Sequence, residues 1–199
     1  MGDMLMKKIL IALLLVISLL CIFGCGKNDS GLLEESYTIE IEIENYGVIT
    51  AVLDAKTAPI TVKNFIGLVE SGFYNGVSFH RIINGFMMQG GDPNGNGTND
   101  EGTPTIKGEF DYNGVENNIS HTRGTLSMAR SQSYNSAASQ FFIMHRDDTR
   151  LDGQYAAFGR VTDGMDIVDK ICIETPVSGD NGYIAPKDRP IIKEIRIVE

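Results

Sequence analysis

Apolar and polar residues alternate most regularly between residues 37 and 53. Ile39, Ile41 and Ile43 alternate with three glutamates, and Asn45-Tyr46-Gly47 separates them from a second apolar segment, Val48 to Leu53. A period of two is typical of a strand with one buried face and one wet face, and Asn with Gly is typical of a turn. The pattern therefore predicts an N-terminal β-hairpin.

Two segments have the spacing of amphipathic helices. Pro59 favours a helix start, an apolar stripe follows it, and Gly72 stands where a helix C-cap is expected. The stripe consists of Val62, Phe65, Ile66 and Val69. A second helix is predicted from about Gly164 to Ile171, with Met165 and Val168 facing inward.

The remaining apolar segments indicate a β-rich fold. Ile195 and Ile197 alternate with Glu194 and Arg196, which predicts a closing strand, whereas Phe79 to Ile83 lacks alternation and predicts a strand with both faces covered. With the hairpin and the helices, these strands fit a mainly β fold, a closed antiparallel barrel with two helices. Neither repeats nor a second domain is predicted, because one core suffices for a segment of this length.

One cation and one amide stand among apolar side chains between Phe79 and Asp92. This segment has the sequence Phe-His-Arg-Ile-Ile-Asn-Gly-Phe-Met-Met-Gln-Gly-Gly-Asp, in which Arg81 is either a solvated strand charge or part of a site. Three further segments follow in order: Gly124 to Ala129, Ser139 to Met144 and Leu151 to Gly159. Together the four segments closely resemble the cyclophilin family of peptidyl-prolyl cis-trans isomerases.

The resemblance runs from about Tyr37 to the C-terminus and implies an eight-stranded barrel capped by two helices. It also implies that the chain isomerises X-Pro bonds without a cofactor or a metal, because no covalent bond is made or broken. By similarity, the catalytic residues are Arg81, Phe86 and Gln89. The substrate-binding residues implied by the resemblance are Met87, Ala129, Arg130, Gln140, Phe142, Leu151 and Tyr155. Tyr155 takes a position that is often histidine.

The chemistry of the X-Pro bond explains why such a set would work. Resonance places a barrier of ~18–20 kcal/mol between the planar cis and trans forms. In the half-rotated state the nitrogen recovers a lone pair, which a guanidinium donor binds better than it binds the planar amide, so that Arg81 would act by differential binding. An apolar floor would seat the proline ring and exclude water, and Gln89 would hold the substrate carbonyl or orient Arg81.

Several of these side chains also have a structural interpretation. Phe141 and Phe142 are neighbours and point to opposite faces of a strand, so only one can line a pocket, and the resemblance selects Phe142. Met87 and Met88, taken singly, are typical core residues. Tyr155 is equally compatible with a rim position and a hydroxyl group in water.

The sequence departs from the family pattern at two places. Arg150 stands where a tryptophan usually precedes Leu-Asp-Gly, and the chain contains no Trp. Since that tryptophan contributes to cyclosporin binding in the family, tight inhibition by the drug is not expected. Asn84 replaces the usual Pro before Gly-Phe-Met, which is a change that a turn tolerates.

The N-terminus resembles a bacterial lipoprotein signal peptide. Lys7 and Lys8 precede an apolar run from Ile9 to Leu20, and a small residue stands just before Cys25. The run is short for a membrane span of about 20 residues, so a cleaved leader is favoured over an uncleaved anchor. We therefore predict a signal peptide at 1–24, a lipidated Cys25 with a polar linker at 25–36, and the isomerase domain at 37–199.

Composition and charge limit the classes of partner that the sequence predicts. The chain carries a net charge of −9, and because the predicted leader carries +1, the remainder carries −10. Nucleic acid is therefore not an expected partner. Cys172 would have no intramolecular partner once Cys21 leaves with the leader and Cys25 carries lipid, so no disulfide is expected. A monomer is the default expectation.

Other chemistries have weak support in the sequence. Asp92 to Gly97 imitates the start of an EF-hand calcium loop, but Thr103 stands where the loop needs Glu. The three histidines lack metal-ligand spacing. Ser127 lacks the glycine two residues later that a nucleophile elbow requires.

Three functions from different classes remain. The first is an isomerase, tethered by lipid to the extracytoplasmic face of the cell membrane, which assists the folding of exported proteins through their proline-containing segments. The second is a module that binds such segments without turnover. The third is a solute-binding lipoprotein, which a single domain without a second lobe disfavours.

Overall fold

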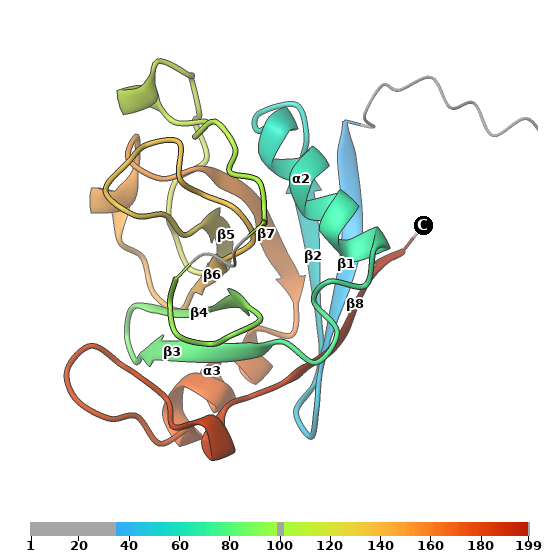
Figure 1. Ribbon diagram of the computed structural model, residues 1–199, viewed down its shortest axis with the longest axis vertical. Helices are drawn as coiled ribbons and strands as arrows, with labels where there is room; N and C mark the ends of the chain where they lie inside the picture. Colours follow the sequence, from blue (N-terminus) through green and yellow to red (C-terminus); the bar gives the residue numbers. More distant parts are fainter. Residues whose placement is uncertain (1–34, 99–101, 199) are drawn as a thin grey trace, which may run out of the picture. The chain divides into compact units, whose positions relative to one another are not determined.

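The computed structural model describes residues 35–98 and 102–198 of the 199-residue chain. Its strands form one antiparallel sheet in the order β3-β4-β6-β5-β7-β2-β1-β8 (Figure 1). The strands are β1 (Ser36–Ile43), β2 (Gly47–Asp54), β3 (Ser78–Ile83), β4 (Met87–Asp92), β5 (Thr125–Met128), β6 (Phe141–Met144), β7 (Ala157–Asp163) and β8 (Ile192–Val198). The predicted mainly β fold with two helices is confirmed. Since β1 begins at Ser36, the last residue of the predicted linker belongs to the sheet.

The N-terminal hairpin and the closing strand are confirmed. β1 pairs with β2 and ends opposite it at Ile43 and Gly47, and Asn45 in the turn has a φ of 64°. Asparagine tolerates this left-handed conformation better than most residues. β8 pairs with the other edge of β1; its Ile195 is buried, whereas Ile197 near the strand end is 39% exposed.

The predicted closure of the barrel is not confirmed. β3 and β8 are the two ends of the sheet, and isolated bridges from Ser78 to Ile191 and from Arg81 to Tyr183 join β3 to the segment before β8 instead of a strand ladder. The Phe79 amide donates to the Pro190 carbonyl at 2.9 Å, but Pro190 has no N–H to return. The sheet is therefore curled and open, and Pro190 withholds one donor at the place where a closing ladder would need it.

Helix α2 (Pro59–Glu70) begins at the predicted proline. Ala58 provides no side-chain cap, but the Glu109 carboxylate accepts hydrogen bonds from the backbone amides of Ile60 and Thr61 at 3.0 and 2.8 Å. A carboxylate at this end satisfies free amides and complements the helix dipole. Gly72 follows the C-cap with a φ of 70°.

Helix α3 (Met165–Glu174) begins after Gly164 and continues past the predicted end at Ile171. Val168 is fully buried and Met165 packs half-buried against the core. α2 packs against β2 and β8, and α3 against β2 and β4 (Figure 1). Among the described residues, neither α2 nor α3 has the length and apolar composition of a membrane span; the predicted leader and Cys25 lie outside this part of the chain.

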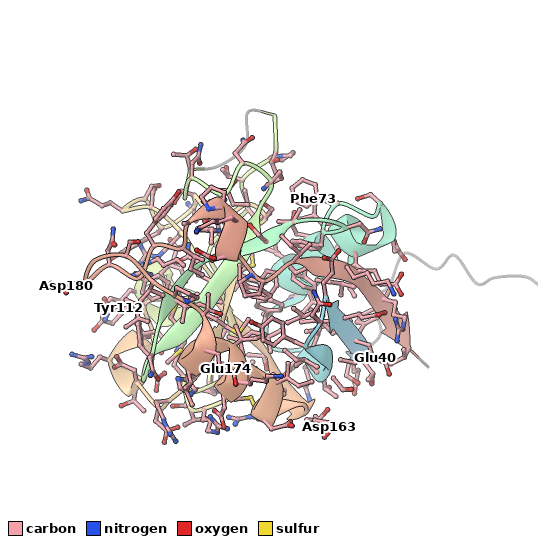
Figure 2. The ribbon with its side chains drawn as sticks, turned by 90° about the horizontal axis from the view of Figure 1, so that it is seen from below. Glu40, Phe73, Tyr112, Asp163, Glu174 and Asp180 are labelled. Atoms are coloured by element: carbon pink, nitrogen blue, oxygen red, sulfur yellow. The ribbon has the colours of Figure 1, made fainter. Side chains whose placement is uncertain are left out.

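In the part of the chain that the structure describes, three short 3-10 helices lie in the loops. They are η1 (Asp111–Asn113), η2 (Thr149–Leu151) and η3 (Pro186–Asp188). Of the acidic side chains labelled in Figure 2, Asp180 and Asp163 lie at the edge of the view, whereas Glu174 lies near its centre. Cys172 is a buried free thiol, and burial raises its pKa to about 12, so it is a core residue and not a nucleophile.

Apolar side chains form two separate clusters. The larger one fills the inside of the curled sheet and contains Phe65, Tyr74, Phe79 and Phe141, whose rings contact one another. The smaller one is built on Met87, Phe142 and Met144, with Ile83, Phe86, Ala129, Leu151 and Tyr155 packed against them. Phe141 and Phe142 thus separate as predicted, one into the core and one onto the opposite face of β6.

Candidate active site

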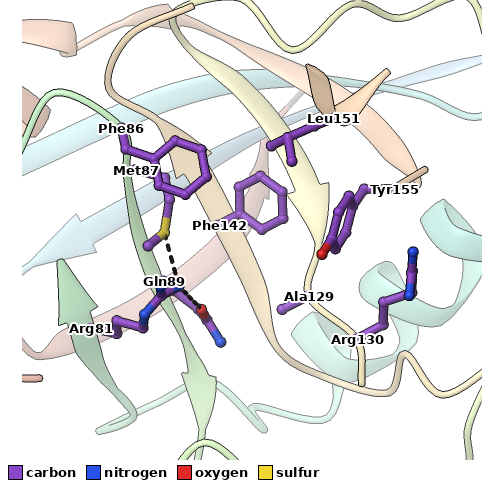
Figure 3. Close-up of a pocket in the computed structure, with 9 residues that line it drawn as sticks. All are labelled: Arg81, Phe86, Met87, Gln89, Ala129, Arg130, Phe142, Leu151 and Tyr155. Atoms are coloured by element: carbon purple, nitrogen blue, oxygen red, sulfur yellow. Dashed lines mark hydrogen bonds between the residues drawn. The ribbon is translucent and has the colours of Figure 1, made fainter. Parts of the chain in front are cut away.

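A cavity opens over the smaller cluster. It has a volume of about 220 Å³, which suits a single small ring better than a drug-sized ligand. Nine side chains line it (Figure 3): Arg81, Phe86, Met87, Gln89, Ala129, Arg130, Phe142, Leu151 and Tyr155. Nine of the ten residues that the sequence predicted for the site therefore lie around one cavity. The tenth, Gln140, borders a neighbouring hollow that shares Gln89.

Arg81 lies half-buried at the polar side of the cavity. Its Nε donates to the Asn181 carbonyl at 2.8 Å, and its Nη1 donates to Gln89 Oε1 at 3.1 Å and lies 4.0 Å from Met87 Sδ. In the described part of the chain, it makes no salt bridge and Nη2 has no hydrogen-bond partner. Burial lowers the pKa of the guanidinium, an effect that Tyr155 opposes. The site thus holds an unpaired cation with donors to spare.

A chain of hydrogen bonds fixes the orientation of Gln89. Arginine can only donate, so Gln89 accepts from Arg81 with Oε1 and presents its Nε2 to Gln140 Oε1 at 3.0 Å. Gln140 Nε2 in turn donates to the Thr98 carbonyl at 3.0 Å. This series of hydrogen bonds starts at a guanidinium, which only donates, and ends at a carbonyl, which only accepts. Neither glutamine amide can therefore flip without losing hydrogen bonds. Gln89 orients Arg81, and Gln140 orients Gln89.

Arg130 forms a wall of the cavity. Its Nε and Nη2 donate to the Gln154 carbonyl at 3.1 and 2.8 Å, and its Nη1 donates to the Ser131 carbonyl at 2.9 Å. The guanidinium also lies over three rings, those of Phe110, Tyr134 and Tyr155, at 4.5 to 5.2 Å from their centroids. Its donors are thus committed to the protein, and it holds Tyr155 in place.

Phe142 is supported from behind by a polar trio, in which His121 and Ser127 are buried and the Asp152 side chain is 37% exposed. His121 stacks on Phe142 with centroids 6.1 Å apart, and its ring nitrogens contact Asp152 Oδ1 and Ser127 Oγ, each at 2.9 Å. The order Ser-His-Asp resembles a hydrolase triad, but Ser127 and His121 are both fully buried, so no substrate reaches them. Burial lowers the pKa of His121, and Asp152 opposes that shift.

The structure also shows the surroundings of three further sequence features: Arg150, the loop after Asp92, and His80. Arg150, which replaces the family tryptophan, is 88% exposed and pairs with Asp148. The Asp92 carboxylate accepts backbone amides of Asn94, Asn96 and Gly97 at 2.7 to 2.9 Å, which explains the calcium-like pattern of that loop without an ion. His80 is buried, and neither ring nitrogen has a partner among the described residues.

Sequence reasoning missed four contributors to this site. Met144 lies fully buried under the cavity floor, Asn181 offers a carbonyl to Arg81, and His121 with Asp152 supports Phe142. Alternation along β6 could have found Met144, which is two residues from Phe142 and shares its face, whereas the other three act through contacts with segments distant in the sequence.

Residues 38–199 match the family described as cyclophilin type peptidyl-prolyl cis-trans isomerase/CLD. The chain belongs to the cyclophilin family. It is accordingly a peptidyl-prolyl cis-trans isomerase, and the resemblance stated from the sequence is confirmed for the domain.

Two bacterial relatives carry the same activity in their names. Peptidyl-prolyl cis-trans isomerase A of Dickeya dadantii is 48% identical over 130 residues, which cover 63% of this chain and 66% of the relative. Peptidyl-prolyl cis-trans isomerase B of Escherichia coli is 41% identical over 167 residues, which cover 78% of this chain and 96% of the relative.

Solved structures agree with the fold. A cyclophilin type isomerase of Cryptosporidium parvum superposes with a TM-score of 0.71 at 31% identity and covers 82% of this chain and 98% of its own. A second structure of that protein, determined in the presence of the dipeptide Ala-Pro, gives a TM-score of 0.70 at 32% identity, over 81% of this chain and 99% of its own.

Proposed function

We propose that this cyclophilin accelerates X-Pro isomerisation by holding the proline ring on Phe86, Met87, Phe142 and Leu151 while Arg81 binds the twisted amide. The observation that supports it best is the unpaired, half-buried guanidinium at the edge of an apolar cavity. Charges seldom lie in such a place without a partner. The substrate would supply that partner at the moment when its nitrogen lone pair is free.

The hydrogen bonds of Arg81 favour this role. Nε and Nη1 are held by Asn181 and Gln89, which fix the plane of the guanidinium before substrate arrives. The Nη2 donors remain for the substrate. A preorganised donor costs little reorganisation and is worth most in a site that excludes water. Since the planar amide nitrogen is a poor acceptor, the bond would form mainly in the transition state, and binding of this kind raises the rate.

We propose proline-containing segments of unfolded proteins as the substrates. The presence of Ala-Pro with the related Cryptosporidium structure supports a proline residue as the unit recognised. The cavity of about 220 Å³ has room for one small ring, and flanking residues would lie outside it.

We further propose that the domain acts as a monomer on the extracytoplasmic face of the cell membrane, where it assists exported proteins. The support is the sequence of residues 1–25, with two lysines, an apolar run and a small residue before Cys25. Two or more acyl chains, such as palmitate, would anchor the protein stably. Mass spectrometry of the native protein tests this: an acylated Cys25 at the N-terminus supports the proposal, and a free N-terminus at Met1 contradicts it. Cys25→Ser is the control that should release the protein from the membrane.

The cis-to-trans rate of a short X-Pro peptide tests the enzymatic proposal. The protein should accelerate exchange, and Arg81→Ala should lower kcat/KM by about 100-fold or more, the size of effect seen when a preorganised donor is removed. Arg81→Lys keeps the charge but loses the planar fork, so it should recover only part of the activity. Binding of the peptide without acceleration would instead indicate a recognition module.

A further inference from the structure

The turn that carries Phe86 is held from behind by His145, the residue that follows β6. The Phe86 carbonyl accepts hydrogen bonds from the backbone amides of His145 and Arg146, at 2.8 and 3.3 Å. The preceding residue, Gly85, donates its amide to His145 Nδ1 at 3.0 Å. Gly85 has a φ of 80°, so this amide points where it does through a backbone conformation that favours glycine. One residue therefore fixes both sides of the turn.

The directions of these bonds determine the tautomer of His145. A backbone amide can only donate, so Nδ1 is the unprotonated acceptor and Nε2 carries the hydrogen. Nε2 lies 3.0 Å from Asp169 Oδ1 on α3 and donates to it. Arg123 holds the same carboxylate with two hydrogen bonds, at 2.6 and 2.8 Å, and donates to the His145 carbonyl at 3.0 Å. The His145 side chain is 2% exposed.

We propose that neutral His145 is a positioning residue that links α3 to the turn before β4, so that the Phe86 side of the proline pocket is fully formed only while the imidazole is uncharged. This inference rests on the proposed function, since it assigns His145 a role in shaping the pocket. The residue does not line the cavity, and it would act through Phe86 alone.

Protonation would remove the bond that positions the turn. The added proton on Nδ1 would face the Gly85 amide, and two donors cannot bond to each other. Asp169 favours the charged imidazole, whereas burial, Arg146 and Arg123 oppose it. Burial is the largest effect and lowers the pKa of His145 below its ordinary value, so we expect the change at a pH below about 6.5.

Two substitutions separate the halves of the imidazole. In His145→Asn, the amide oxygen takes the place of Nδ1 and can still accept from Gly85, but the bond to Asp169 is lost. In His145→Gln, the amide nitrogen takes the place of Nε2 and can still donate to Asp169, but the acceptor for Gly85 is lost. Neither side chain titrates, so both variants should lack the pH dependence that His145 contributes.

The experiment measures kcat and KM for a short X-Pro peptide between pH 5 and 8 with the full-length chain, together with the NMR shift of the Gly85 amide. For the unmodified chain, we expect kcat/KM to fall about threefold to tenfold on protonation, mainly through KM, because the loss of one hydrogen bond loosens a seat used in ground and transition states alike. His145→Asn should keep the high-pH value at every pH. His145→Gln should show the low-pH value of kcat/KM at every pH.

Asp169→Asn serves as a matched control, because it changes the Nε2 partner and leaves Gly85 untouched. Removal of the carboxylate should move the pH midpoint of the unmodified profile to lower pH. Equal kcat/KM for His145→Asn and His145→Gln, or a pH profile of His145→Asn that matches the unmodified chain, would overturn the inference. If the unmodified chain shows no catalysis, the proposed function fails, and the inference is then decided by the Gly85 amide alone: a shift that follows pH only while His145 is present supports the link, and no shift overturns it.

Discussion

Phe141 and Phe142 are neighbours on β6 and almost equally buried, with exposures of 0% and 5%, yet they belong to different regions. Phe141 packs among Phe65, Tyr74 and Phe79 inside the sheet, with ring centroids 5.3 to 5.9 Å from its own. Phe142 packs among Met87 and Met144 on the other face, with a cavity in front and polar groups around it. Burial alone therefore does not tell a structural aromatic from a binding one; the neighbours do.

The largest effects on stability and on activity should come from replacing Phe141 and Phe142, one at a time, by alanine. Phe141→Ala should lower the free energy of unfolding by about 3–5 kcal/mol, because it leaves a closed cavity in the core. Phe142→Ala should lower it by less than half as much, since the space it leaves joins an open pocket, but it should strongly reduce isomerase activity. Urea unfolding and peptide exchange on both variants check this pair. Equal losses of stability would contradict the division into two regions.

Gln89 provides the next test of the pocket region. Gln89→Leu removes the acceptor of Arg81, a hydrogen bond to a charged group, and should lower kcat/KM about tenfold to 100-fold with little change in stability. Gln140→Leu leaves the bond between Arg81 and Gln89 in place and removes only its support, so it should cost about threefold. Steady-state kinetics on the two variants would refute the proposed order if Gln140→Leu proved the more damaging.

Acidification should lower the free energy of unfolding, because the fold buries histidines. Burial lowers the pKa of His80, His121 and His145, so the unfolded chain binds protons more readily than the folded one. The free energy of unfolding should hold its full value above about pH 6.5 and fall as the pH drops from there towards the folded-state pKa values. Urea unfolding at pH 7.5 and 5.5 measures this. The carboxylates with lowered pKa, such as Asp148, titrate at still lower pH and do not account for the fall.

His145→Asn should reduce that acid sensitivity. The variant removes one of the three groups that take up a proton on unfolding, so the difference in unfolding free energy between the two pH values should be smaller than in the unmodified chain. An unchanged difference would mean that His145 does not titrate in this range.

The smallest effect is expected at Arg150. This side chain is 88% exposed, and its ion-pair partner among the described residues is Asp148, whose side chain is 12% exposed. Exposed pairs contribute little, so Arg150→Ala should leave the melting temperature and the exchange rate unchanged within error. A clear loss of activity would place Arg150 in the substrate path.

Local pattern and family resemblance were sufficient for much of this account. The hairpin, both helix starts and the separation of Phe141 from Phe142 follow from periodicity, a proline and side-chain alternation. Resemblance supplied the residues around the cavity. Each of these signals lies within a few residues of the feature that it predicts.

What the sequence could not predict depends on contacts between distant segments. Glu109 caps α2 from 48 residues away, and Asn181 meets Arg81 across 100 residues. The barrel stays open between β3 and β8, although the strand pattern and the family resemblance predicted closure. The bond between His145 and Gly85 arises only once β4 and β6 pair. Such contacts follow from the packed fold, which no local period encodes.

In the proposed mechanism, Arg81 binds the twisted amide better than the planar one. The most direct test measures, by NMR exchange, the isomerisation rate of an X-Pro peptide saturating the protein, and separately the Kd of that peptide, in the unmodified chain and in Arg81→Ala. We expect Arg81→Ala to slow the isomerisation rate of the bound peptide about 100-fold or more while its Kd changes less than about threefold. An unchanged rate with a weaker Kd would contradict it, because Arg81 would then bind the ground state as well as the transition state.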